Sequence, residues 1–184
     1  MVERLTRTVV LVGMMGAGKT AVGRALAARI GVPFIDSDTE IEAAAQMSIA
    51  EIFERDGEAF FRGREAAVIA RLLAGAPCVL STGGGAYMAA ENRAAISARG
   101  VAVWLKADLD LLWDRVRHKS NRPLLQTDDP RGTLARLLEE REPIYGEAQI
   151  TVAARGDWSI EQMAAAVHAA LVDAGYAGEA TRDG

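Results

Sequence analysis

The sequence has one cysteine, few aromatic residues and no excess of basic charge. Cys78, alone among 184 residues, cannot form an internal disulfide and has no second cysteine with which to share a metal ion. Aromatic residues make up 5% of the chain, too few to indicate stacking along single-stranded nucleic acid. With 21 Lys and Arg against 25 Asp and Glu, the chain lacks the basic excess that neutralises nucleic-acid phosphates. We therefore expect no nucleic-acid partner. The overall charge is still compatible with a local basic pocket for a small anion.

Long hydrophobic runs are missing as well. No uninterrupted apolar run approaches the length that spans a bilayer. The first ten residues, MVERLTRTVV, lack the apolar stretch and the cleavage site of a signal peptide. Hydrophobic residues still make up 50% of the chain and charged residues 25%, which is ordinary for a globular protein. We expect a cytoplasmic, reduced monomer that makes no membrane contact and folds as a single domain over residues 1–184.

Short runs rich in valine and isoleucine alternate with longer helical patterns. The runs that we expect to form strands are residues 8–13, 32–36, 77–81, 101–106 and 149–153. The segments that we expect to form helices are residues 19–31, 48–74, 88–98, 108–117, 131–141 and 158–174. Apolar strands separated by helices are typical of a parallel sheet covered on both faces. The sequence predicts an α/β fold, with a five-stranded parallel sheet flanked by helices.

Three local features refine this prediction. The pattern in residues 48–74 indicates two helices that meet near Gly57, and Ser48 followed by Glu51 is typical of a capping box. Residues 117–132, RHKSNRPLLQTDDPRG, are charged and contain two prolines, so we expect them to form a mobile lid. The small and polar residues 175–184 are expected to be a frayed tail.

The first predicted strand runs into GMMGAGKT, which matches the phosphate-binding pattern G-x-x-x-x-G-K-[ST] between a strand and a helix. Its glycines let consecutive backbone N–H groups point inward, and the following helix adds its positive N-terminal end. A chance match in this context is improbable, so we expect a nucleoside triphosphate site. Lys19 would reach the outer phosphates, and the Thr20 hydroxyl would bind Mg²⁺. The residues expected at this site are Gly13, Met14, Met15, Gly16, Ala17, Gly18, Lys19, Thr20 and Ala21.

The phosphate loop alone does not name a reaction, because GTPases, motor ATPases and small-molecule kinases share it. The run PFIDSD ends in two carboxylates, Asp36 and Asp38, which repel each other unless each has its own cation or donor. The run PCVLS, by contrast, is followed by a threonine and three glycines, so no acid stands where a switch or motor ATPase would place one. N-capping of a helix that starts near Thr39 is an alternative role for Asp38.

Six motifs stand in one order along the chain: GMMGAGKT, DSD, FRGRE, GGGA, RPLL and REPIY. Together they resemble the shikimate kinase family, and the resemblance runs from about residue 8 to about residue 170. It implies a small fold like that of nucleoside monophosphate kinases, with a closing lid. It also implies transfer of the ATP γ-phosphate to the 3-hydroxyl of shikimate, in the route to aromatic amino acids, with one Mg²⁺ ion.

The resemblance assigns roles to the two acids and to the phosphate-binding cations. Asp36 would support Mg²⁺ together with Thr20. Asp38 would accept hydrogen bonds from the substrate hydroxyls, either only positioning the substrate or also acting as its base. Arg122, in the lid, would stabilise the charge on the transferring phosphoryl group, so the resemblance makes Lys19, Asp38 and Arg122 the catalytic residues. Arg115 would stack on the adenine.

The acceptor substrate would lie against residues 36–64, the glycine run and the REPIY motif. The resemblance implies that Arg62 and Arg141 bind the substrate carboxylate and that Glu65 holds Arg62 in place. A surface ion pair with Glu65 is an alternative reading of Arg62. The substrate-binding glycines would be Gly83, Gly84 and Gly85, of which the second donates its N–H group.

Two departures from the family pattern and three rival functions stay open. Trp158 stands in AARGDWS near a position that usually carries a smaller residue, so it either contacts adenine or anchors the next helix. Gly146 replaces a more usual charged residue after REPIY. A gluconate kinase or a nucleoside monophosphate kinase would share the fold, and a non-catalytic nucleotide-binding module would bind ATP without phosphorylating an acceptor.

Overall fold

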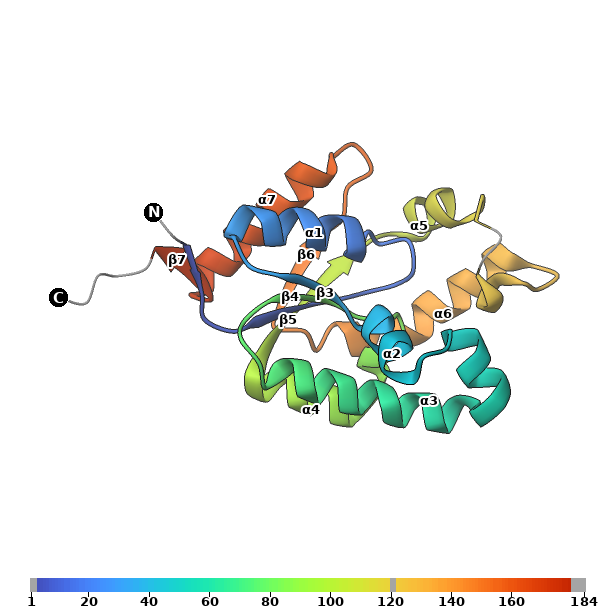
Figure 1. Cartoon of the computed structure of the whole chain (residues 1–184). Helices are drawn as coiled ribbons and strands as arrows, with labels where there is room; N and C mark the ends of the chain where they lie inside the picture. Colours follow the sequence, from blue (N-terminus) through green and yellow to red (C-terminus); the bar gives the residue numbers. More distant parts are fainter. Residues whose placement is uncertain (1–2, 120–121, 180–184) are drawn as a thin grey trace.

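A five-stranded parallel sheet forms the centre of the computed structural model, which describes residues 3–119 and 122–179 (Figure 1). The strand order is β3-β4-β2-β5-β6, and all four neighbouring pairs are parallel. The strands are β2 (Thr8–Val12), β3 (Phe34–Asp36), β4 (Val79–Ser81), β5 (Gly100–Lys106) and β6 (Ile150–Ala153). Each of the five predicted strands is therefore confirmed, as is the predicted fold class.

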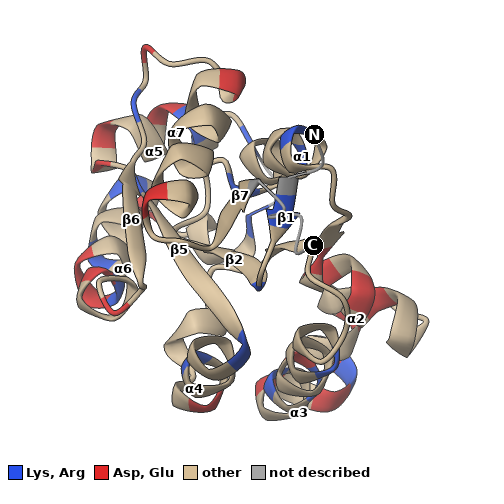
Figure 2. Ribbon diagram, turned by 90° about the vertical axis from the view of Figure 1, so that its left-hand side faces the viewer, with Lys and Arg blue, Asp and Glu red and all other residues tan. Residues whose placement is uncertain are grey.

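Helices cover both faces of this sheet. The helices α1 and α7 pack together over one face, and α3 and α4 pack over the other (Figures 1 and 2). Figure 2 shows that acidic and basic residues both occur along α3 and α4. The helices are α1 (Lys19–Ile30), α2 (Ser37–Ala45), α3 (Ile49–Leu73), α4 (Ala90–Arg99), α5 (Leu109–Val116), α6 (Pro130–Tyr145) and α7 (Ile160–Asp173), with short 3-10 helices η1 (Ala86–Met88) and η2 (Pro123–Leu125).

The central strands are buried because both of their faces are covered. All five residues of β2 and the first six of β5 are buried, which explains why the sequence shows valine-rich runs without polar alternation. Leu11 and Asp36 both pair with Ser81 in the sheet register. Strands β2, β3 and β4 therefore end level with one another, and the loops that follow them meet at one edge of the sheet.

Glycine and serine shape α3 as the sequence predicted. Gly57 has φ 83° and ψ 173° inside α3, so the segment is two helices joined at a sharp bend. The Ser48 side chain accepts a hydrogen bond from the backbone N–H of Glu51 at 3.2 Å and caps the first of them. The bend turns the first part of α3 toward α2 at the site end of the molecule (Figure 1).

Two other regions differ from the sequence-based expectations. Residues 177–179, expected in a frayed tail, form β7 (Ala177–Glu179), which pairs antiparallel with β1 (Glu3–Leu5). Burial of Leu5 and Ala177 stabilises this pair, whereas residues 180–184 lie outside the described residues. The expected lid, residues 117–132, contains η2 and the first turn of α6, and its residues 120–121 are likewise not described. Within the described ranges, no helix combines the length and the apolar character needed to cross a membrane.

Candidate active site

The loop between β2 and α1 has the conformation that its glycines allow. Gly13, Gly16 and Gly18 all have positive φ, and Gly18, at φ 96°, opens α1. A side chain on Gly16 would meet Val116 Cγ1 at 2.7 Å, so the glycine also lets the loop pack closely against α5. The loop is closed by a hydrogen bond from the Ala17 N–H to the Met14 carbonyl at 3.1 Å. The predicted phosphate cradle is thus formed, with its N–H groups at the start of a helix.

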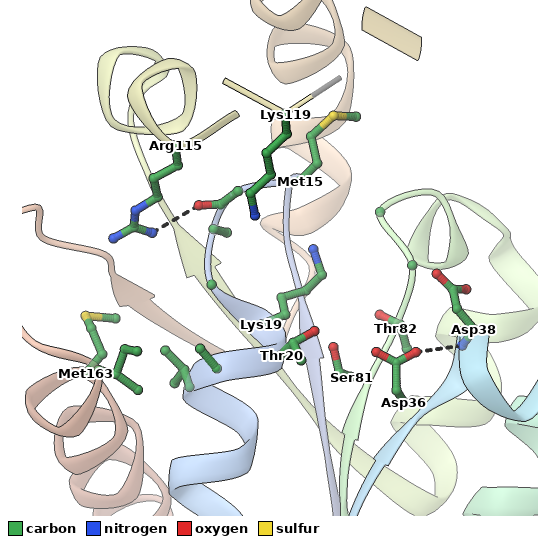
Figure 3. Close-up of a pocket in the computed structure, with 18 of the residues that line it drawn as sticks. Met15, Lys19, Thr20, Asp36, Asp38, Ser81, Thr82, Arg115, Lys119 and Met163 are labelled. Carbon is green, nitrogen blue, oxygen red and sulfur yellow. Dashed lines mark hydrogen bonds between the residues drawn. The ribbon is translucent and has the colours of Figure 1, made fainter. Parts of the chain in front are cut away.

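This loop forms one wall of a cleft of about 540 Å³ at the edge of the sheet where β2, β3 and β4 end (Figure 3). Of the predicted residues 13–21, Gly13 and Met14 are buried in the loop, and the other seven line the cleft. The remaining lining residues come from five separate segments: Val22, Asp36, Asp38, Ser81, Thr82, Gly83, Gly84, Arg115, Lys119, Arg122, Trp158, Ser159, Ile160 and Met163.

Lys19 folds back over the loop that precedes it. Its ammonium group donates to the Gly13 carbonyl at 2.7 Å and to the Met14 carbonyl at 3.0 Å. Burial and the nearby Arg122 charge lower the pKa of Lys19 to about 8, although Asp38 partly opposes this. A buried ammonium whose neighbours include further cations gains stability when an anion enters the cleft.

Arg122 provides a second cationic group with unused hydrogen-bonding capacity. The residue lines the cleft from the expected lid, and its Nε is buried without a hydrogen-bond partner in the described part of the chain. A buried guanidinium donor without a partner is costly, so its presence indicates a site that an anionic ligand completes. Lys19 and Arg122 together make the P-loop end of the cleft positive in a chain of net charge −4.

Asp36 ends β3, and Asp38 lies two residues further on. The helix cap that the sequence suggested for Asp38 is provided by Asp36 instead. Asp36, not Asp38, caps α2: its Oδ1 accepts from the backbone N–H of Asp38 at 2.9 Å and of Thr39 at 3.2 Å. The helix begins at Ser37 rather than near Thr39, and an N-cap residue directly precedes its helix. The Asp38 carboxylate is therefore not the cap, and it faces the glycine run across the cleft (Figure 3).

The surroundings of Asp38 favour its neutral form. Burial, then the charges of Asp36 and Glu65, raise the pKa of Asp38 to about 6, although Lys19 pulls it down. Because the folded-state pKa lies above the unfolded value of 3.8, the folded protein binds this proton more tightly and loses stability as the pH rises through 4 to 6. Above pH 6 the ionised Asp38 is a cost to folding, which is typical of a residue kept for function.

Removing this charge should therefore stabilise the ligand-free protein. We expect Asp38→Asn to raise the free energy of unfolding by about 1–3 kcal/mol at pH 7.5, since each pKa unit corresponds to about 1.4 kcal/mol. The gain should shrink as the pH falls through 6 and vanish near pH 4. Urea unfolding at a series of pH values measures it, with Asp114→Asn on the exposed side of α5 as the control. Equal stability of Asp38→Asn and wild type at pH 7.5 would contradict the assigned environment.

Arg62 is held by a buried partner. Its Nη1 donates to Glu65 Oε1 at 2.9 Å, and Glu65 is 1% exposed. Burial raises the pKa of Glu65, while the hydrogen bond from Arg62 opposes that rise. The predicted Arg62–Glu65 contact is therefore present with the Glu65 carboxylate in the interior, while Arg62 Nε also lies 3.6 Å from the exposed Glu58.

The three consecutive glycines each face a different charged side chain. A Cβ on Gly83 would lie 3.1 Å from Asp38 Oδ1, one on Gly84 would lie 3.1 Å from Arg141 Nη1, and one on Gly85 would lie 2.6 Å from Arg62 Nη2. Any larger residue would displace these groups, so the lack of side chains lets them approach the same stretch of backbone. Arg62, Gly85 and Arg141 are absent from the lining of the large cleft, and they extend the site beyond Gly84.

The comparisons with known proteins agree with this geometry. The shikimate kinase family model matches residues 15–172. A shikimate kinase from Ruegeria pomeroyi is 70% identical over 91% of this chain and 86% of its own length. The structure of a shikimate kinase from Acinetobacter baumannii in complex with shikimate superposes with a TM-score of 0.86, at 39% identity, over 92% of this chain and 94% of that one. The chain belongs to the shikimate kinase family.

The family prediction is confirmed, and the protein is a kinase with the α/β fold of this family. A gluconokinase from Sinorhizobium meliloti also matches, with a TM-score of 0.63 over 93% of this chain and 94% of its own length. At 21% identity, that likeness shows a common fold and nothing about the acceptor substrate. The side chains around the glycine run therefore carry the argument about the acceptor.

The far end of the cleft in this shikimate kinase family member holds Arg115 and Trp158. Arg115 Nη1 donates to the Gly16 carbonyl at 3.0 Å, which fixes its guanidinium against the phosphate loop (Figure 3). Trp158 directly precedes Ser159, the N-cap of α7, and also lines the cleft. The two alternatives for Trp158 are compatible, because the residue that leads into α7 also lines the cleft. Stacking of Arg115 on adenine stays a prediction.

Several lining residues were not singled out from the sequence. Lys119 reaches into the cleft from the expected lid, and Met163 from α7 (Figure 3). Ser81 ends β4 and Thr82 follows it, and the Thr82 hydroxyl donates to the Leu11 carbonyl at 3.0 Å. In the sequence, the one signal that Ser81 and Thr82 belong to the site is their position between a buried strand and the glycine run. Lys119 carries no motif, and the fold alone brings it to the cleft.

The predicted Mg²⁺ ligands fit a cation that is shared with phosphate. Thr20 and Asp36 both line the cleft and offer oxygen atoms, the type of ligand that Mg²⁺ prefers (Figure 3). Asp36 Oδ1 is engaged at the start of α2, which orients the carboxylate and leaves Oδ2 outside the cap. The described residues include no group of three or more His, Cys, Asp and Glu that could hold a metal. A cation bound through one or two protein oxygens together with nucleotide phosphates is consistent with this set.

Proposed function

We propose that this kinase transfers the γ-phosphate of ATP to the 3-hydroxyl of shikimate, giving shikimate 3-phosphate on the route to aromatic amino acids. The observation that carries the proposal is the convergence of Asp38, Arg62 and Arg141 on three consecutive glycines beside the phosphate loop. Shikimate is a cyclic carboxylic acid that bears hydroxyl groups. Two guanidinium groups suit its carboxylate, and an acceptor-only carboxylate suits its hydroxyls.

The P-loop end of the cleft supplies charge neutralisation for the donor. The backbone N–H groups of the loop and the Lys19 ammonium would bind the β- and γ-phosphates, replacing the carbonyl contacts that Lys19 now makes. The Arg122 guanidinium, with its partnerless Nε, would bind the transferring phosphoryl group. The proposal also includes one Mg²⁺ ion held by Thr20 and Asp36. When bound, this ion would further neutralise the charge of the phosphates.

The acceptor end of the site aims a hydroxyl at the γ-phosphorus. Arg62 and Arg141 would fix the carboxylate, and the Gly84 N–H would donate to the substrate. The 3-hydroxyl oxygen bonds to the phosphorus as the bond from phosphorus to the ADP oxygen breaks. With its pKa at about 6, Asp38 is ionised at neutral pH and accepts the hydrogen bond of the 3-hydroxyl proton. Whether that proton moves to Asp38 in the transition state or after it, the carboxylate holds the oxygen in line.

The proposal also includes the setting of the reaction. We place the reaction in the cytoplasm and expect the protein to act as a monomer. Shikimate and ATP are the partners in this proposal, without nucleic acid or membrane.

An assay with two acids side by side tests the proposed function. ADP release with ATP and Mg²⁺ should saturate with shikimate and stay at the ATPase background with gluconate at equal millimolar concentration. Phosphorylation of gluconate instead would favour the rival kinase of the same fold. ATP binding without turnover of either acid would favour a non-catalytic nucleotide-binding module. Either result would overturn the proposal.

A further inference from the structure

Tyr145, the last residue of α6, is a buried tyrosine whose hydroxyl reaches the glycine run. Its side chain is 0% exposed, and its hydroxyl donates to the Gly84 carbonyl at 2.6 Å. A buried phenol group needs a hydrogen-bond partner, and here that partner is the backbone of a proposed substrate-binding residue. The contact joins positions 61 residues apart in the sequence.

The same hydroxyl lies beside Arg141. The two residues are four apart on α6, so their side chains lie on one face of the helix. Burial raises the pKa of Tyr145, while the nearby positive charge of Arg141 opposes that rise. The phenol therefore keeps its proton at neutral pH and donates it to the Gly84 carbonyl. Arg141 Nη1 lies 3.1 Å from the position of a Cβ on Gly84, so the hydroxyl and the guanidinium meet at the same glycine.

The ring of Tyr145 is fixed as well. It stacks on Trp104 of β5 with ring centroids 5.9 Å apart and an interplanar angle of 29°. Trp104 Cδ1 lies 3.4 Å from the position that a Cβ on Gly13 would occupy, so the indole packs beneath the start of the phosphate loop. The phenol is thus attached to the rigid sheet on one side and to the acceptor site on the other.

We propose that Tyr145 is a positioning residue that sets the spacing between Gly84 and Arg141, and with it the acceptor's carboxylate pocket. The inference rests on the proposed function for the identity of the acceptor. It assigns Tyr145 to acceptor binding and not to ATP binding, because its hydroxyl bonds to Gly84 and lies beside the Arg141 charge, on the acceptor side. Loss of the hydroxyl should loosen both groups while the ring still fills its place against Trp104.

The variant Tyr145→Phe tests this assignment through steady-state kinetics. Because one buried hydrogen bond is lost, we expect the KM for shikimate to rise about tenfold, while the KM for ATP and kcat change less than about threefold. Tyr176→Phe removes a hydroxyl near β7, at the other end of the molecule, and should leave all three constants unchanged. An unchanged KM for shikimate, or an equal rise in both KM values, would overturn the positioning role.

A measurement without substrate separates this inference from the proposed function. The Ala86 and Met88 N–H groups donate to the Gly83 and Gly85 carbonyls, both at 3.1 Å, so their hydrogen exchange reports opening of the glycine run. In the ligand-free protein, Tyr145→Phe should raise both exchange rates about tenfold and leave that of Ala17 in the phosphate loop unchanged. Exchange equal to that of wild type would overturn the inference even if shikimate is phosphorylated. A tenfold rise would support it even if another acid proves to be the acceptor.

Discussion

Asp38→Asn is expected to lower kcat with shikimate about a thousandfold, within the range that proton-accepting groups contribute to catalysis. An amide is isosteric with the carboxylate but carries no charge, so the 3-hydroxyl keeps at most a weak neutral acceptor and loses the group that can take its proton. The dissociation constant for ATP should change less than about twofold, because phosphate binding is assigned to Lys19, Arg122 and the loop backbone. Single-turnover kinetics and equilibrium titration with a non-hydrolysable ATP analogue measure the two effects separately.

The expected rise in unfolding free energy provides a control for this variant. If Asp38→Asn is inactive, binds ATP and is more stable than wild type at pH 7.5, loss of fold cannot explain the lost activity. A large parallel loss of ATP affinity would show that Asp38 belongs to the nucleotide site. Retention of most of the activity would remove Asp38 from catalysis altogether.

Arg122→Ala is the second substitution with a large expected effect. We expect kcat to fall about a thousandfold, as when an arginine that stabilises a transferring phosphoryl group is removed. The KM for shikimate should change little, because Arg122 lies at the P-loop end of the cleft and the acceptor arginines lie beyond Gly84. Rapid-quench kinetics at saturating ATP and shikimate would measure the phosphoryl-transfer step directly.

Arg117→Ala is a matched control for Arg122. Arg117 starts the same segment but is absent from the cleft lining, and its guanidinium lies 3.9 Å from Asp114 on an exposed face. Its loss should leave kcat within about twofold of wild type, since exposed ion pairs contribute little. Equal effects of the two substitutions would indicate a general property of the segment and would contradict the role of the Arg122 guanidinium.

The sheet and the phosphate loop were predictable because their signals are local. The apolar composition of a run such as TVVLV is enough to predict a buried parallel strand. The GMMGAGKT motif likewise predicts the conformation of its own backbone. Gly57 likewise marked the bend in α3, and the three-residue spacing of Arg62 and Glu65 marked their contact. In each case the residues that decide the structure lie within a few positions of one another.

Features that depend on distant residues were not predictable. The strands β1 and β7 have three residues each, and residues more than 170 positions apart pair between them. The sequence offered Asp38 as a possible cap, but Asp36 takes that role because the helix begins at Ser37 rather than near Thr39. Lys119 and Tyr145 reach the site through the fold alone. The acceptor arginines required the resemblance to a family, because Arg62 and Arg141 meet only through the glycine run between them.

Binding of the acceptor carboxylate by Arg62 is tested most directly by a ratio of two constants. This ratio is kcat/KM for shikimate divided by kcat/KM for its methyl ester. In wild type this ratio should be at least about a hundredfold, because the ester lacks the charge that two guanidinium groups bind. Arg62→Lys keeps a cation beside Glu65 but cannot form two parallel hydrogen bonds, so the ratio should fall about tenfold. Arg64→Lys, at a neighbouring exposed arginine over the Phe60 ring, should leave it unchanged. A ratio in Arg62→Lys equal to that of wild type would contradict the account.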